Sequence, residues 1–179
     1  MKLIAFVGMP ASGKSEAAAI AKKLGIPVVN MGDVVREETA RRGLPPKDEN
    51  IGGTGTALRQ EEGMDAIAKR CVPKIRLIKT PVVVVDGTRN INEIEYFKKE
   101  FGTDFMLIAI HTPFKIRFER VIKRSRSDDM SSIEELKRRD EREIGWGLDK
   151  AIEKADIIIE NTGTIDKFQE QIEELLGKI

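Results

Sequence analysis

The sequence predicts an α/β protein in which a parallel sheet of about five strands is covered by helices on both faces. Short, continuous apolar runs alternate along the chain with stretches of helical periodicity. The first run leads directly into a glycine-rich loop, and an amphipathic helix follows that loop. Polar and charged residues follow most of the other runs, which is expected where parallel strands end at one edge of a sheet.

Five apolar runs are the predicted strands, at residues 3–7, 26–30, 82–86, 105–110 and 157–159. The run at 82–85 consists of four valines and is the strongest strand signal, because β-branched residues favour strands. The stretches between the runs carry apolar residues at i, i+3, i+4 and i+7, which is typical of helices packed on a sheet. The order predicts right-handed crossovers and a ligand crevice at the carboxyl ends of the strands.

The loop after the first run fits the phosphate-binding pattern GxxxxGK(S/T). Its residues are Gly8, Met9, Pro10, Ala11, Ser12, Gly13, Lys14 and Ser15. Backbone N–H groups in such a loop, at the positive end of a helix dipole, can surround phosphate oxygens. Lys14 adds a full positive charge, and Ser15 adds a hydroxyl ligand for Mg²⁺. The sequence therefore predicts a polyphosphate site in a three-layer P-loop NTPase domain.

Length and composition predict one domain spanning residues 1–179 and disfavour several kinds of partner. The chain has 31 basic and 30 acidic residues, a net charge of +1, so no overall field attracts nucleic acid. The single cysteine, Cys71, excludes an internal disulfide and lies on an apolar helical face. We expect a cytoplasmic protein with no nucleic-acid or membrane partner, and the oligomeric state stays open.

The stretch between the second and third predicted strands is expected to form a small inserted lobe. A polar helix begins at Met31 and ends near Gly43. Two prolines and the run Gly-Gly-Thr-Gly-Thr predict an irregular loop over residues 43–56. A helical pattern resumes over residues 57–71, and Gly63 is a point where it can break.

Several charged residues follow the predicted strands and suit phosphoryl transfer. Asp86 ends the valine run and is a candidate Mg²⁺ ligand. Gly87 follows it where many hydrolytic P-loop proteins place a glutamate, which favours transfer to an acceptor over hydrolysis. Arg36 and Arg89 can clamp an acceptor phosphate, although each taken alone reads as a surface arginine.

Arg120 and Arg124 lie at i and i+4 on one helical face, and Arg139 belongs to a nearby run of arginines. The alternative interpretation is a solvated charged helix. We assign His111 to packing or hydrogen bonding, because phosphoryl transfer needs no histidine. Trp146 is assigned to the core rather than to stacking on a base.

These segments resemble the nucleoside monophosphate kinases and dephospho-coenzyme A kinases, closest to the adenylate-kinase-related proteins of archaea. Gly32-Asp33-Val34-Val35-Arg36 resembles an acceptor-side motif, Gly-Asp-x-x-Arg, and Asp86-Gly87-Thr88-Arg89 resembles Asp-Gly-Phe-Pro-Arg with one residue fewer. The segments around Arg120 and Arg139-Asp140 are similar to the two ends of the family's lid. The tail, including Asn161 to Gly163, is similar to the dephospho-coenzyme A kinases.

The resemblance implies ATP and Mg²⁺ as cofactors, an acceptor-binding insertion at about residues 31–72 and a short lid at about residues 120–143. It implies that ATP is held by the loop residues named above together with Asn161 and Gly163, and Mg²⁺ by Ser15 and Asp86. The implied acceptor residues are Gly32, Asp33, Arg36, Arg59 and Arg89. The implied catalytic residues are Lys14, Arg89, Arg120, Arg124 and Arg139.

The leading hypothesis is a kinase that transfers the γ-phosphoryl of Mg-ATP to a small-molecule nucleotide or nucleotide-like acceptor, of the AMP, CMP or dephospho-coenzyme A class. The alternative is a regulatory ATP-binding or slow ATPase module that acts through a protein partner. A GTPase switch is disfavoured because the chain has no Asn-Lys-x-Asp guanine signature.

Overall fold

The strands of the computed structural model form one parallel sheet in the order β2-β3-β1-β4-β5. The model describes residues 1–124 and 132–179, without the side chain of Arg124. The strands are β1 (Lys2–Val7), β2 (Val28–Asn30), β3 (Val82–Asp86), β4 (Phe105–His111) and β5 (Ile157–Glu160). The predicted α/β class and the five strands are confirmed.

The central strand β1 is buried on both faces, as its continuous apolar run predicts. Leu3, Ala5 and Val7 pack into a core shared with α2, α3, α4, α5 and α8. Ile4 and Phe6 point to the opposite face and pack with α1 and α9. Because successive side chains alternate across a strand, one apolar run supplies both layers of the core.

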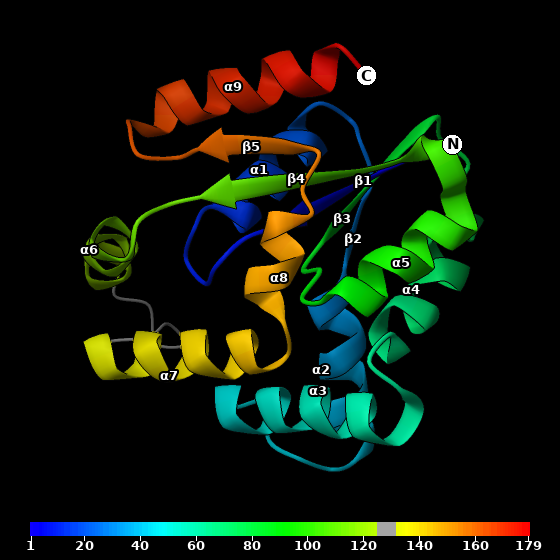
Figure 1. Cartoon of the computed structure of the whole chain (residues 1–179), viewed down its shortest axis with the longest axis vertical. Helices are drawn as coiled ribbons and strands as arrows, with labels where there is room; N and C mark the ends of the chain where they lie inside the picture. Colours follow the sequence, from blue (N-terminus) through cyan, green and yellow to red (C-terminus); the bar gives the residue numbers. More distant parts are fainter. Residues whose placement is uncertain (125–131) are drawn as a thin grey trace.

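The helices cover both faces of this sheet and also its carboxyl edge (Figure 1). Two cover one face, α1 (Lys14–Lys23) and α9 (Ile165–Gly177). The other face carries α2 (Met31–Arg41), α3 (Asp48–Glu62), α4 (Ala66–Leu77), α5 (Ile91–Phe101) and α8 (Leu148–Glu153). At the carboxyl edge lie α6 (Phe114–Arg124) and α7 (Ile133–Gly145), and a short 3₁₀ helix spans Gly102–Asp104. No described helix is both long and apolar enough to cross a membrane.

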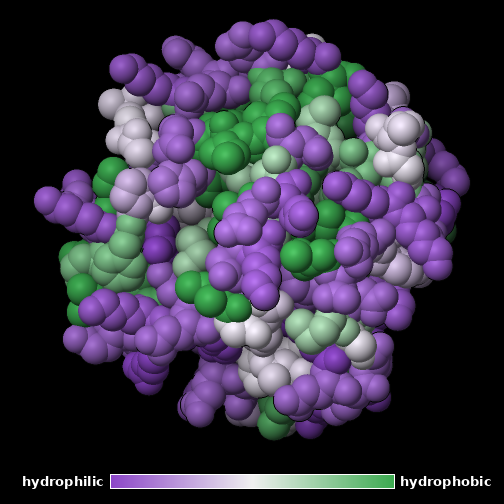
Figure 2. Space-filling model, viewed as in Figure 1, coloured by the Kyte–Doolittle hydropathy of each residue, from purple (hydrophilic) through white to green (hydrophobic). Residues whose placement is uncertain are grey.

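Polar residues surround this core over most of the face shown in Figure 2, and apolar side chains gather there near the level of β5 and α9. β5 is an edge strand, and Ile158 within it is 60% exposed. Polar side chains also define helix starts: the Ser132 hydroxyl accepts a hydrogen bond from the Glu135 N–H and so caps α7.

The predicted loop over residues 43–56 is wrong, because its second half forms the first turns of α3. Two of the glycines there, Gly52 and Gly55, are explained by close packing rather than by a turn. A Cβ added to Gly52 would lie 2.5 Å from Cζ of Arg142, and one added to Gly55 would lie 3.3 Å from Nη1 of Arg59. Only glycine lets the arginine side chains approach the helix backbone this closely. The expected break at Gly63 is confirmed, since α3 ends there.

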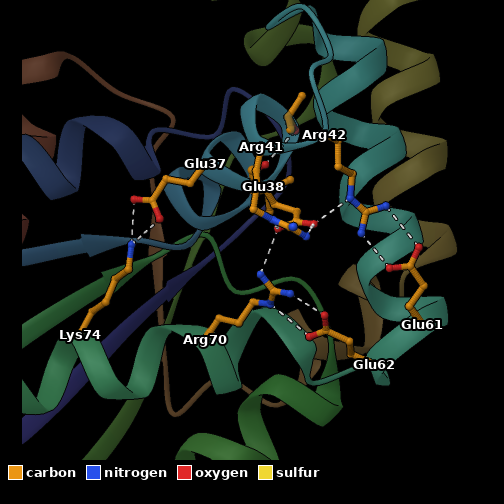
Figure 3. Close-up of polar contacts among 10 residues, drawn as sticks. Glu37, Glu38, Arg41, Arg42, Glu61, Glu62, Arg70 and Lys74 are labelled. Atoms are coloured by element: carbon orange, nitrogen blue, oxygen red, sulfur yellow. Dashed lines mark hydrogen bonds and ion pairs between the residues drawn. The ribbon is translucent and has the colours of Figure 1, made fainter.

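A network of ion pairs joins α2, α3 and α4 around the carboxylate of Glu38 (Figure 3). Glu38 is 3% exposed and accepts hydrogen bonds from Arg41, Arg42 and Arg70. Arg42 also pairs with Glu61 of α3, and Arg70 of α4 also pairs with Glu62. Hydrogen bonds from Arg41 and Arg42 lower the pKa of Glu38 from its ordinary value of 4.5 to about 2. The carboxylate of Glu38, with those of Glu61 and Glu62, thus links the three helices.

We expect Glu38→Gln to reduce the free energy of unfolding at pH 7 and to lose this effect in acid. Because the pKa of Glu38 is lower in the folded protein, its contribution is complete above about pH 4.5 and disappears as the pH falls towards 2. Urea unfolding of wild type and variant at pH 7 and pH 3 measures the difference. Glu95→Gln, an exposed glutamate on α5, is the control. A difference that stays constant from pH 7 to pH 3 would contradict this assignment.

The packing of α3 on α7 predicts different effects of alanine at two adjacent glycines. Gly53 faces open space, so Gly53→Ala should stabilise the protein by about 0.5–1 kcal/mol through helix propensity. Gly52→Ala should bring no such gain, because its Cβ displaces the Arg142 side chain that pairs with Asp48. Thermal unfolding of both variants measures the difference. Equal stabilisation by the two substitutions would show that the close approach is unimportant.

Candidate active site

The glycine-rich loop between β1 and α1 is shaped by close contacts with neighbouring segments. Ala11 and Gly13 have φ angles of 61° and 113°, in the left-handed region. A Cβ at Gly8 would lie 2.5 Å from the carbonyl oxygen of Ile110 at the end of β4. A Cβ at Gly13 would lie 2.3 Å from Nδ2 of Asn161, which follows β5. The two glycines of the motif are therefore required by the approach of β4 and β5.

Side chains that follow β4 and β5 hold the loop from behind. The Thr112 hydroxyl and the Asn161 amide both donate to the carbonyl oxygen of Ser12, at 2.8 and 2.9 Å. Arg117 of α6 donates to the carbonyl oxygen of Pro10 at 3.0 Å. The guanidinium of Arg117 is itself fixed by two hydrogen bonds of 2.8 Å to Asp140 of α7. Carbonyl groups of the loop thus accept hydrogen bonds from donors on three separate segments.

The Lys14 ammonium is buried and folds back onto its own loop. Its Nζ donates to the carbonyl oxygens of Gly8 and Met9, at 2.6 and 3.0 Å. Burial, with the positive charge of Arg89 nearby, lowers the pKa of Lys14 from 10.5 to about 8. A bound anion would favour the charged form, so this site suits a phosphate group.

A pocket of about 180 Å³ opens in front of the loop at the carboxyl edge of the sheet. It brings together many of the predicted site residues from the loops after β1, β2 and β3 and from α7. These are Pro10, Ala11, Gly13, Lys14, Ser15, Gly32, Arg36, Asp86, Arg89 and Arg139, and the lining also includes Glu16, Asn30, Gly87 and Val121.

The start of α2 forms the wall opposite the loop. The Asn30 side chain accepts a hydrogen bond of 2.8 Å from the Gly32 N–H and so caps this helix. Arg36 lies one turn further on and pairs with Asp33 at 2.7 Å, with more than half of each side chain exposed. The Arg36 guanidinium is therefore available to a ligand, since such an exposed pair is weak.

Asp86 and Ser15 fit a Mg²⁺ ion. Asp86 is 5% exposed, and its Oδ1 has no hydrogen-bond partner among the described residues. A buried carboxylate oxygen without a partner is costly, and a cation or its bound water would satisfy it. Mg²⁺ bound to a nucleotide commonly takes one or two protein ligands, with phosphates and water completing its shell. The donor set of this pocket is therefore appropriate for Mg²⁺ carried by a nucleotide.

Glu143 of α7 is a site residue that the sequence interpretation missed. It is 2% exposed, and its two carboxylate oxygens lie 3.2 Å from Nε of Arg89 and 3.2 Å from Nε of Arg139. Burial alone would raise the pKa of Glu143, but the charges of Arg89, Arg139 and Lys14 outweigh it and lower the pKa. The spacing from Arg139 to Glu143, i to i+4, was the available sequence signal.

Other predicted residues lie away from the pocket lining. Arg59 is 5% exposed, donates to Glu93 of α5 at 2.9 Å and stacks over Trp146 at 4.4 Å from the ring centroid. Arg120 donates to the Asn161 carbonyl oxygen at 2.8 Å and so lies beside the loop support. Gly163 is exposed after β5. The Arg124 side chain and residues 125–131 of the predicted lid lie outside the described residues.

His111 and Trp146, which the sequence analysis did not assign to the site, both have structural partners. His111 ends β4 and its Nδ1 lies 2.8 Å from a carboxylate oxygen of Glu160, with both side chains exposed. Trp146 is only partly buried, and its indole N–H donates to the hydroxyl of Thr56 at 3.1 Å. It therefore packs between α3 and α7 rather than in the central core.

The sequence of this chain matches one domain family and several individual proteins. Residues 7–137 match the AAA domain family. A UPF0200 protein of Methanosarcina barkeri is 57% identical over 99% of this chain and 95% of its own length. A UPF0200/UPF0201 protein of Archaeoglobus fulgidus is 62% identical over the whole chain, which spans 56% of that relative.

Solved structures with the same fold include small-molecule kinases. A gluconokinase from Sinorhizobium meliloti aligns with a TM-score of 0.61 at 18% identity, over 99% of this chain and 92% of its own. A shikimate kinase from Acinetobacter baumannii, solved with shikimate, aligns with a TM-score of 0.58 at 16% identity, over 99% of this chain and 94% of the kinase chain. At such low identity these likenesses establish the fold alone. From its sequence matches, the chain belongs to the AAA domain family and to the UPF0200 proteins.

Proposed function

We propose that this protein is a kinase that transfers the γ-phosphoryl of Mg-ATP to a small anionic acceptor of the nucleotide or nucleotide-like class. The observation that carries the proposal is the convergence in one pocket of Lys14, Arg89 and Arg139 with Asp86, whose Oδ1 has no hydrogen-bond partner among the described residues. Phosphoryl transfer depends mainly on holding donor and acceptor in line and on neutralising charge. A pocket lined by four cationic side chains, these three and Arg36, and by a metal-type carboxylate supplies these two requirements.

The donor would bind against the loop, because Lys14 lines the pocket and backbone N–H groups at a helix start can bind phosphate oxygens. Ser15 and Asp86 would hold Mg²⁺, which neutralises phosphate charge when bound. Arg139 would lie on the donor side, and the family resemblance supports the same assignment for Arg120 and Arg124. Asn161 would act indirectly, because its amide holds the Ser12 carbonyl of the loop.

The acceptor would bind between the start of α2 and the loop after β3. Arg36 and Arg89 line the pocket from these two sides, and guanidinium groups bind phosphate and carboxylate oxygens with two parallel hydrogen bonds. The Gly-Asp-x-x-Arg and Asp-Gly-Thr-Arg segments that carry them support an AMP, CMP or dephospho-coenzyme A acceptor. Gluconate and shikimate, which the names of the two structural neighbours mention, are anionic alternatives.

A regulatory ATP-binding or slow ATPase module is the second candidate function. It is favoured by the relative from Archaeoglobus fulgidus, in which this chain matches only 56% of the length. In such a protein the second part could receive the effect of ATP binding. Saturable ATP binding without any acceptor phosphorylation would favour this candidate.

We expect ADP release from Mg-ATP to be stimulated by one acceptor in a panel of AMP, CMP, UMP, GMP, dephospho-coenzyme A, gluconate and shikimate. Mass spectrometry should then find a phosphate added to that acceptor. Lys14→Ala should lower turnover about 100- to 1,000-fold, because it removes a charge next to the transferred group. Lys22→Ala, at the exposed end of α1, is the matched control. Normal turnover in folded Lys14→Ala would contradict the loop assignment.

Arg89→Ala should raise the KM for the acceptor by roughly 10- to 100-fold and change the KM for ATP much less. The estimate corresponds to the loss of one charge-assisted hydrogen bond. Steady-state kinetics with each substrate varied in turn measures both constants. Arg138→Ala removes an exposed arginine of α7 and serves as the control. Equal acceptor kinetics in wild type and Arg89→Ala would remove Arg89 from the acceptor site.

A further inference from the structure

The buried carboxylate of Glu143 is not explained by ATP or Mg²⁺ binding. Arg89 and Arg139 line the pocket, whereas Glu143 is 2% exposed and is not part of the lining. The carboxylate therefore lies behind the two guanidinium groups and contacts both of them, at 3.2 Å each. This arrangement joins the loop after β3 to α7 through one acidic group.

Only one of these contacts is a hydrogen bond, in which Nε of Arg139 donates to Oε1 of Glu143. Glu143 Oε2 lies in ion-pair range of Arg89 but has no hydrogen-bond partner among the described residues. Nη1 of Arg89 is also buried and lacks a partner in the same part of the chain. Arg89 therefore keeps unused donor capacity, and an anion that enters the pocket would supply the missing acceptor.

The carboxylate of Glu143 also offsets the repulsion among the positive charges around it. Lys14, Arg89 and Arg139 line the same pocket, and Glu143 contacts both of the arginines. Without an anion, three cations would repel one another in a partly buried pocket. A fixed carboxylate offsets this repulsion when the pocket holds no ligand, and it weakens the attraction for any ligand that enters.

We propose that Glu143 is the internal counter-charge of the pocket, which positions Arg89 and Arg139 from behind and limits how tightly they retain a phosphate-bearing ligand. The role in product release rests on the proposed kinase function. The effect of Glu143 on the anion affinity of the two arginines does not depend on that function. In a kinase, this would prevent the phosphorylated product from remaining bound.

Calorimetric titration with inorganic phosphate, with and without saturating Mg-ADP, tests the proposal. Glu143→Gln removes the negative charge and keeps the side-chain shape, so phosphate should bind at least about tenfold more tightly than to wild type. A purely structural role for Glu143 predicts the reverse, because loss of packing would weaken the site. Glu141→Gln makes the same charge change at an exposed position on α7 and should leave phosphate affinity unchanged.

Unchanged or weaker phosphate binding by folded Glu143→Gln would overturn the proposal. If Glu143→Gln does not fold, Glu143→Asp decides the matter. Its shorter side chain withdraws the charge from the arginines, so phosphate affinity should rise by a smaller factor, and an affinity equal to that of wild type would overturn the proposal.

Acceptor kinetics separates this proposal from the kinase assignment. If an acceptor is found, Glu143→Gln should lower its KM and also lower kcat, because product release slows. If no acceptor is phosphorylated by wild type but phosphate still binds more tightly to Glu143→Gln, the kinase assignment fails and the counter-charge role stands.

Discussion

The repulsion among Lys14, Arg89 and Arg139 is the constraint on which the arrangement of this site depends. Each charge comes from a different part of the chain: the first helix, the loop after β3 and α7. Burying a cation such as Lys14 without an anion is unfavourable, and the two further cations nearby, on the partly exposed Arg89 and Arg139, increase the cost. Asp86 and Glu143 supply the opposite charge from β3 and α7. The strand order β2-β3-β1-β4-β5 places β3 beside β1, so the Asp86 carboxylate lies near the loop that needs it.

The loop itself is held by a second set of polar contacts, on the side away from the pocket. Thr112, Asn161 and Arg117 donate to loop carbonyls, so the peptide groups that carry those carbonyls are fixed in orientation. Preorganised donors lose little free energy when a charged ligand binds, because they do not need to reorient. Arg117 is tied to Asp140 of α7, the helix that also carries Arg139 and Glu143. The same helix therefore supports the back of the loop and the charges in front of it.

Much of the fold and part of the site could be predicted from the sequence. The strands were predictable because buried parallel strands are continuous apolar runs, and the loop because its spacing is specific. Gly52 and Gly55 were placed in a loop because their role in α3 depends on Arg142 and Arg59, which a local pattern does not include. Arg117 and Glu143 were missed for a related reason. A charged residue in a charged helix is usually solvated, and only the tertiary fold reveals that these two are buried.

The same reasoning explains Arg59, which the sequence interpretation assigned to the acceptor. Arg59 joins α3 to Trp146 by stacking and to α5 through Glu93, and Glu93 also accepts a hydrogen bond of 2.6 Å from the Arg89 N–H. The backbone of Arg89 is therefore held from the α3 side, while its side chain is held by Glu143 from the α7 side. Arg142 and Trp146 join α3 directly to α7, so the two supports of Arg89 are also linked to each other. Displacing α3 from α7 would strain both contacts of Arg89, and the position of this arginine depends on the packing of the two helices.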